Sequence, residues 1–149
     1  MARRPPDPSP RADHEGPDDR CVRKGFDGIE LDNVDGYENR TGFPLSADDQ
    51  LRYDVWLANQ AHRRGLSVAL KNDVAQVEDL VSYFDYALNE ECFTYDECDL
   101  LTPFVAAGKA VFGVEYAMKT DEFCPAANAL DFNFLRKRLS LRGWRVACG

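Results

Sequence analysis

Short apolar runs alternate along the chain with longer stretches of helical periodicity, from Gly25 to the C-terminus. Each run combines aliphatic with β-branched or aromatic residues and is bounded by glycine or polar residues, which is typical of strands. On this basis five strands are predicted, at residues 26–32, 66–70, 84–88, 109–116 and 132–136.

Helical periodicity fills the intervals between these runs. A helix is predicted from Ser46 to Gly65, because Asp49 completes a capping box with Ser46 and Gly65 is a good residue to end a helix. Its apolar positions recur at helical spacing, at Leu51, Val55, Ala58 and Ala61. Shorter helices are predicted at 74–82, 99–107 and 121–130, and a helix or turn around Trp144.

Strands that alternate with helices are parallel and joined by right-handed crossovers. The sequence therefore predicts an α/β fold, and an open doubly wound sheet and part of an eight-stranded barrel both fit five such units. No G-x-G-x-x-G or P-loop segment follows a strand, so no nucleotide site is predicted. Residues 1–20 hold five of the eight prolines among Arg and Asp, and are predicted to be a disordered tail.

Charge and cysteine content narrow the class of protein. The formal net charge is −8, which argues against a nucleic-acid partner and suits a neutral or cationic substrate, although solubility alone also explains it. No apolar run approaches the roughly 18 residues of a membrane span, and no signal-peptide h-region is visible. Five cysteines suit an exported protein. No metal or cofactor is expected, since the chain has no Cys-x-x-Cys pair and its two histidines have no ligand spacing.

Polar side chains, most of them acids and amides, lie at the ends of four consecutive predicted strands. They are Glu30, Asp32 and Asn33, then Lys71, Asn72 and Asp73, then Asn89, Glu90 and Glu91, and finally Glu115 and Tyr116. Because the functional face of a parallel α/β protein lies at the carboxyl ends of its strands, these residues predict one functional cleft. Two of the acids have a simpler interpretation, Asp73 as a helix N-cap and Asp35 as a turn residue.

Two carboxylates on different strands supply the nucleophile or base and the acid that cleavage of a glycosidic bond requires. Asp32 is predicted to be the nucleophile or base, because Asn33 and Lys71 would keep it ionised. Glu90 is predicted to be the acid, because Tyr86 and Phe93 would raise its pKa by desolvation. The predicted substrate-binding residues are Glu30, Asn33, Tyr37, Lys71, Asn89, Tyr95 and Glu115.

Four motifs carry a family resemblance. GFDGIELDNVDGY at residues 25–37, LNEECFTYDEC at 88–98, LKND at 70–73 and the CPAANAL…W…C pattern at 124–148 together resemble glycoside hydrolase family 114. The resemblance covers about residues 21–149. It implies a TIM-barrel domain with endo-α-1,4-polygalactosaminidase activity, a polysaccharide substrate and an extracellular location. It also implies Asp32 and Glu90 as the catalytic pair, and the disulfides Cys92–Cys98 and Cys124–Cys148, with Cys21 single.

The five strands resemble the fourth to eighth of such a barrel, which takes roughly 250 residues and eight strands. The chain is therefore predicted to be a truncated C-terminal part of the domain. Two alternatives stay open beside an active glycosidase. One is a non-catalytic remnant or carbohydrate-binding fragment of the same fold. The other is a metal-dependent hydrolase with Glu30, Asp32, Asp73 and Glu115 as ligands, against which the absence of strand-end histidines counts. The sequence does not indicate the oligomeric state.

Overall fold

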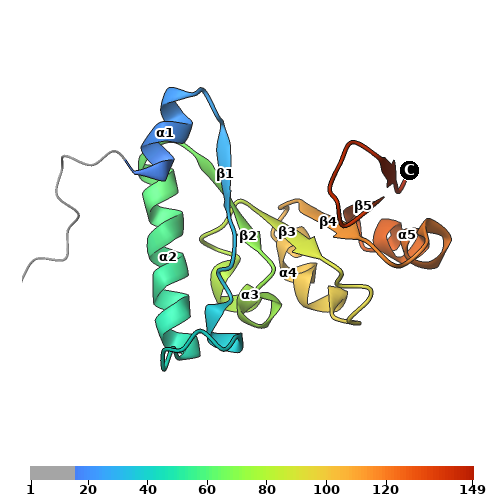
Figure 1. Cartoon of the computed structure of the whole chain (residues 1–149), viewed down its shortest axis with the longest axis horizontal. Coiled ribbons are helices and arrows are strands. Elements are labelled where there is room, and N and C mark those ends of the chain that lie inside the picture. Colours follow the sequence, from blue (N-terminus) through green and yellow to red (C-terminus); the bar gives the residue numbers. More distant parts are fainter. Residues whose placement is uncertain (1–15) are drawn as a thin grey trace, which may run out of the picture.

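A computed structural model describes residues 16–149 and contains one sheet of six strands that follow one another in chain order (Figure 1). The strands are β1 (Gly28–Leu31), β2 (Ser67–Lys71), β3 (Tyr86–Glu90), β4 (Val111–Glu115), β5 (Asn133–Lys137) and β6 (Arg145–Ala147). The first five strands are parallel, and β6 is antiparallel to β5. All five predicted strands are thus present and parallel, as expected.

A helical segment connects each parallel strand to the next. The helices are α1 (Pro17–Arg23), α2 (Ala47–Arg63), α3 (Val77–Leu80), α4 (Thr102–Ala106) and α5 (Thr120–Ala129), with 3₁₀ turns η1 (Gly36–Glu38), η2 (Val74–Gln76) and η3 (Cys98–Leu101). Five consecutive parallel strands with a helical crossover after each of the first four give an α/β fold that corresponds to part of a TIM barrel. None of the helices described is long and apolar enough to cross a membrane.

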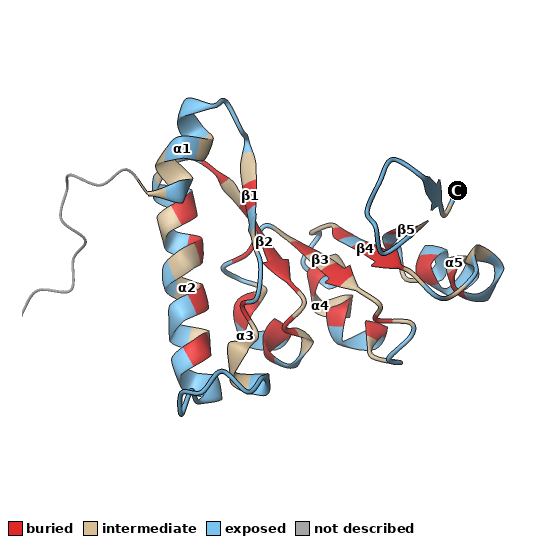
Figure 2. Ribbon diagram, in the orientation of Figure 1, coloured by how far each residue is buried: buried red, intermediate tan, exposed pale blue. Residues whose placement is uncertain are grey.

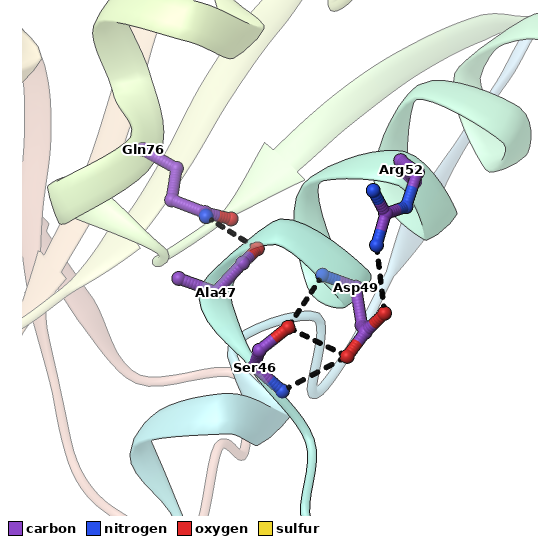
Figure 3. A network of polar contacts seen from close by, with 5 residues as sticks. All are labelled: Ser46, Ala47, Asp49, Arg52 and Gln76. Carbon is purple, nitrogen blue, oxygen red and sulfur yellow. Dashed lines mark hydrogen bonds and ion pairs between the residues drawn. The ribbon is translucent and has the colours of Figure 1, made fainter.

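Helix α2 begins where the sequence predicted. The Ser46 hydroxyl accepts a hydrogen bond from the Asp49 amide and the Asp49 carboxylate accepts one from the Ser46 amide, which is the expected capping box (Figure 3). The buried residues of α2 recur every three or four positions, at Gln50, Asp54, Ala58 and Ala61. They lie on the side of the helix that faces the strands (Figure 2).

The core lies between one face of the sheet and the helices. Phe84, Phe104 and Phe123 are fully buried there, together with aliphatic residues of β2, β3 and β4. Gly113 of β4 permits the tightest contact, because a Cβ atom at this position would lie 2.0 Å from Cζ of Phe134. The opposite face of the sheet is more open, and Phe112 of β4 is 43% exposed on that side.

Both ends of the described chain differ from expectation. Residues 17–20, placed in the predicted disordered tail, belong to α1, and Arg64, directly after α2, pairs with Asp19 at 2.7 Å. The rest of that tail, residues 1–15, lies outside the described residues. At the other end, the predicted alternative of a helix around Trp144 is wrong, whereas a turn at residues 139–140 does precede it: β6 pairs with β5, and the Arg138 guanidinium lies 4.9 Å from the Trp144 ring centroid.

Two disulfides fix the C-terminal half, and both are the expected pairs. Cys92–Cys98 closes the loop after β3, and Cys124–Cys148 joins α5 to the residue that follows β6. Cys21 in α1 is the free cysteine of the described residues. The family resemblance had implied each of these assignments.

Candidate active site

Register and alternation decide which strand-end side chains share a face. Glu30 pairs with Ala69, Lys71 with Leu88, and Glu90 with Val114. Paired residues of neighbouring parallel strands point the same way, as do residues two apart on one strand. One face of the sheet, called here the site face, therefore carries Glu30, Asp32, Lys71, Glu90 and Tyr116.

Lys71 joins the two predicted catalytic carboxylates. Its Nζ lies 2.9 Å from Oδ1 of Asp32 and 3.0 Å from Oε2 of Glu90. The Lys71 side chain is 8% exposed, whereas the side chains of Asp32 and Glu90 are 63% and 32% exposed. One nearly buried ammonium thus holds two carboxylates that remain open to solvent.

This contact keeps Asp32 ionised, as the sequence predicted. The hydrogen bond from Lys71 lowers the pKa of Asp32, burial opposes it, and the Lys71 charge and the Asn33 amide add to the lowering. Burial raises the pKa of nearby Glu30, and the carboxylates of Asp32 and Glu90 raise it further, while Lys71 opposes them. The carboxylates of Glu30, Asp32 and Glu90 thus lie around the one ammonium of Lys71.

The predicted elevation of the Glu90 pKa is wrong for the unliganded site. Burial does raise it, but hydrogen bonds from the Tyr116 hydroxyl and from Lys71 outweigh burial, so the pKa of Glu90 is lowered. Tyr116 was named among the strand-end residues of the predicted cleft but was given no role there. It follows β4 two positions after Val114, the register partner of Glu90, so alternation along the strand identifies it.

Asn72 is a second strand-end residue to which the sequence analysis gave no role. Its backbone is left-handed (φ 54°), and its Oδ1 accepts a hydrogen bond of 2.9 Å from the Glu90 amide. Asparagine tolerates this conformation better than most residues do. Asn72 thus fixes the end of β3 from the end of β2, and with it the backbone that carries Glu90.

Two predicted substrate-binding residues, Asn89 and Glu115, do not reach the cleft. Glu115 is fully buried, and its carboxylate accepts hydrogen bonds from the Phe93 amide (2.8 Å) and the Thr94 hydroxyl (2.7 Å). Asn89 is 1% exposed, and its Oδ1 accepts from the Cys92 amide at 2.9 Å. Both point to the helix side, one position from a residue of the site face, and both hold the loop after β3 in place.

Three other predicted residues lie on loops. Asn33 follows β1 in the left-handed region (φ 59°) and is exposed, and Tyr95, in the loop closed by the Cys92–Cys98 disulfide, is 66% exposed. Tyr37, in η1, donates a hydrogen bond of 3.2 Å to Oδ1 of Asp73. The expectation that Asp73 caps a helix is wrong, since its side chain makes no capping hydrogen bond and its backbone is left-handed (φ 39°).

The metal-dependent alternative finds no support. Among residues 16–149, no three His, Cys, Asp or Glu side chains are grouped so that they would hold a metal ion. In particular, Glu115 is held away from the site face by its own hydrogen bonds. Around Lys71 the site face offers the carboxylates of Glu30, Asp32 and Glu90, the Lys71 ammonium and the Tyr116 phenol.

Comparison with known proteins gives three matches to solved structures and one to a family. The sequence profile of glycoside-hydrolase family GH114 matches residues 19–149. The crystal structure of Aspergillus fumigatus Ega3 in complex with galactosamine is similar with a TM-score of 0.80 and 32% identity, over 88% of this chain and 57% of that one. The glycoside hydrolase domain of PelA from Pseudomonas aeruginosa shares the fold, with a TM-score of 0.65 and 14% identity over 87% and 60%. No curated protein sequence matches.

Proposed function

The chain belongs to glycoside-hydrolase family GH114, and on that basis we propose that it acts in cleaving α-1,4-linked galactosamine polysaccharide, with Asp32 and Glu90 as the catalytic pair. The observation that carries the proposal is the contact of both carboxylates with the single Lys71 ammonium. The chain spans 57% of Ega3.

The separation of the two carboxylates supports a retaining mechanism. Because each has an oxygen within 3.0 Å of Lys71 Nζ, these two oxygens lie roughly 6 Å apart at most. Carboxyl groups are about 5–5.5 Å apart in retaining glycosidases and about 6.5–9.5 Å apart in inverting ones. In this mechanism Asp32 attacks the anomeric carbon as the leaving oxygen takes a proton from Glu90. Water then hydrolyses the glycosyl ester while Glu90 accepts the proton of that water.

The environment of each carboxylate supports these roles. Hydrogen bonds from Lys71 and the Asn33 amide favour the ionised form of Asp32, which a nucleophile requires. For Glu90, burial is the largest influence and it raises the pKa. A sugar in the cleft would bury Glu90 further and so strengthen the influence that favours its protonated form.

The charge of the site face supports the choice of substrate. The carboxylates of Glu30, Asp32 and Glu90 lie around the Lys71 ammonium, and the whole chain carries a formal charge of −8. Galactosamine is cationic when its amine is protonated, and galactosamine is the ligand in the Ega3 complex. We also propose that residues 21–149 form one domain of an extracellular protein, which the family match and the two disulfides support.

Product analysis with azide tests the proposal and the roles together. The chain and its variants Asp32→Gly and Glu90→Ala are assayed on an α-1,4-galactosamine oligomer and on an activated aryl galactosaminide. Each variant should lose most of its activity on the oligomer. With Asp32→Gly, azide should give a glycosyl azide of inverted configuration, and with Glu90→Ala one of retained configuration.

The exposed acid Asp48, in the first turn of α2, provides the matched control, and Asp48→Asn should leave the rate unchanged. Near-parental activity in either site variant would exclude that residue from catalysis. Binding of the oligomer without any cleavage would instead favour the carbohydrate-binding alternative for this chain.

A further inference from the structure

A buried polar cluster lies behind the turn that carries Tyr37. Asp54 of α2 and Asp73 at the end of β2 are both 2% exposed or less. The Gln50 amide donates to Oδ1 of Asp54 at 2.8 Å, and the Tyr37 hydroxyl donates to Oδ1 of Asp73 at 3.2 Å. Gln76, 7% exposed, belongs to the same region. These five residues form what we call the Asp54–Asp73 cluster.

The cluster has more buried acceptors than donors. Oδ2 of Asp54, Oδ2 of Asp73 and Oε1 of Gln76 are buried without a hydrogen-bond partner among the described residues. All three atoms are acceptors, and a buried acceptor without a donor is costly. The side-chain amide of Gln76 does not supply the missing donor, since it donates to the Ala47 carbonyl at 2.9 Å (Figure 3). A proton on one carboxyl group would convert an acceptor into the missing donor.

The charges around the cluster favour that proton. Burial raises the pKa of Asp73 to about 7, and the carboxylates of Asp54, Glu38 and Asp35 add to this, against the hydrogen bond from Tyr37. Burial raises the pKa of Asp54 to about 6, with Asp35 adding to it and Gln50 opposing it. The Asp73 carboxyl group therefore keeps its proton in acid and loses it as the pH rises through about 7.

The η1 turn lies directly against this cluster. A Cβ atom at Gly36 would lie 3.3 Å from Oε1 of Gln50, and the next residue, Tyr37, makes the hydrogen bond to Asp73. The position of η1 therefore depends on a carboxyl group that gains and loses a proton near neutral pH.

We propose that Asp73 is a positioning residue for Tyr37: its buried, protonated carboxyl group accepts the hydrogen bond of the Tyr37 hydroxyl, and so holds η1 against the end of β2. Loss of this proton leaves two buried negative charges beside Asp35 and Glu38, and η1 moves away to hydrate them. The consequence for sugar binding rests on the proposed function, whereas the consequence for Tyr37 does not.

Tyrosine labelled with ¹³C at Cζ reports the hydrogen bond directly. The labelled chain is titrated from about pH 5 to about pH 9, and the Tyr37 resonance is assigned by its absence from Tyr37→Phe. The native resonance should show one transition near neutral pH. In Asp73→Asn, the side-chain amide does not titrate and keeps an N–H donor in the place of the carboxyl proton. The transition should therefore be absent. A native Tyr37 resonance that does not respond to pH, or a transition retained in Asp73→Asn, overturns the proposal. Asp79→Asn, an exposed acid of α3, should leave the transition unchanged.

The pH dependence of stability gives a second measurement. The pKa of Asp73 is higher in the folded chain than the unfolded value of about 3.9. This group therefore favours folding in acid, and its contribution falls as the pH rises from about 4 through about 7. Urea midpoints of Asp73→Asn should fall less steeply, since only the contribution of Asp54 remains, and midpoints that fall in parallel with the native chain contradict the proton on Asp73.

The kinetic constants for the galactosamine oligomer distinguish a positioning role of Asp73 from a role in folding alone. At acidic pH, Asp73→Ala should raise KM for the galactosamine oligomer by about tenfold, the worth of one hydrogen bond, and leave kcat within about twofold. Asp73→Asn should restore the native KM. A lower kcat at unchanged KM overturns the positioning role. If no variant cleaves or binds the oligomer, the proposed function fails, and the Tyr37 resonance still decides this inference.

Discussion

Tyr116 donates a hydrogen bond to the Glu90 carboxylate from the neighbouring strand. Glu90 therefore has a phenol on one oxygen and the Lys71 ammonium on the other. Both contacts stabilise the ionised form, which is why the pKa of Glu90 is lowered despite partial burial. The protonated Glu90 that the proposed mechanism needs is thus opposed by two groups that can each be removed.

Removal of the phenol should shift the pH profile of cleavage. In Tyr116→Phe, the ionised form of Glu90 loses a donor and its pKa rises. Glu90 then stays protonated to higher pH, so the alkaline limb of kcat/KM should move upward by about one pH unit. Rates across the pH range measure this shift. Tyr83→Phe, at an exposed tyrosine after α3, should leave the profile unchanged, and an alkaline limb that moves downward would exclude Glu90 as the acid.

Removal of the ammonium should affect both carboxylates. In Lys71→Met, Asp32 and Glu90 lose their common counter-charge, so both pKa values rise and the acidic limb of kcat/KM should move to higher pH. We expect kcat/KM to fall on the order of a hundredfold, because the pair is no longer held in position. Lys24→Met, at the exposed end of α1, serves as the control. A loss of the same size in Lys24→Met would mean that charge alone, and not the bridge, sets the rate.

The sequence predicted the strands well and the site only in part. Glu30 and Asp32 share a face because strand alternation is a local property that the sequence displays, whereas Lys71 joins them through the register of β1 with β2. Asn89 was misplaced although alternation sets it opposite to Glu90, and Glu115 was misplaced because its face relative to Glu90 depends on the register of β3 with β4. Asp73 was misinterpreted for a similar reason, since its partner Tyr37 is 36 residues away.

Gly113 should tolerate no side chain. In Gly113→Ala, the added methyl group would meet the Phe134 ring at 2.0 Å, and the ring would have to move within a packed aromatic group that includes Phe93 and Phe123. We expect a loss of about 1–3 kcal/mol in the free energy of unfolding, measured with urea. Gly143→Ala, where a Cβ atom would have no neighbour within 4 Å, should be nearly neutral. Equal effects at the two positions would contradict the packing argument.

The Cys124–Cys148 disulfide should stabilise the end of the sheet. It closes a loop with a sequence separation of 24, for which chain entropy predicts a loss of about 3 kcal/mol on removal. In the double variant Cys124→Ala with Cys148→Ala, urea unfolding should show this loss. Amide exchange at Val146 and Ala147 should accelerate, because β6 keeps only its pairing with β5. Cys21→Ala is the matched control, and protection of these amides that matches the parent would disprove the role of the bridge.

Because two acids share Lys71, salt should affect two parts of this surface differently. The ammonium is shielded from solvent, and dissolved ions screen such a contact weakly. Asp32 and Glu30 face outward with excess charge, and their long-range pull on an approaching cation fades beyond the Debye length, about 8 Å at physiological ionic strength. Added salt should therefore slow the arrival of a positively charged sugar while the arrangement of carboxylates that receives it stays intact.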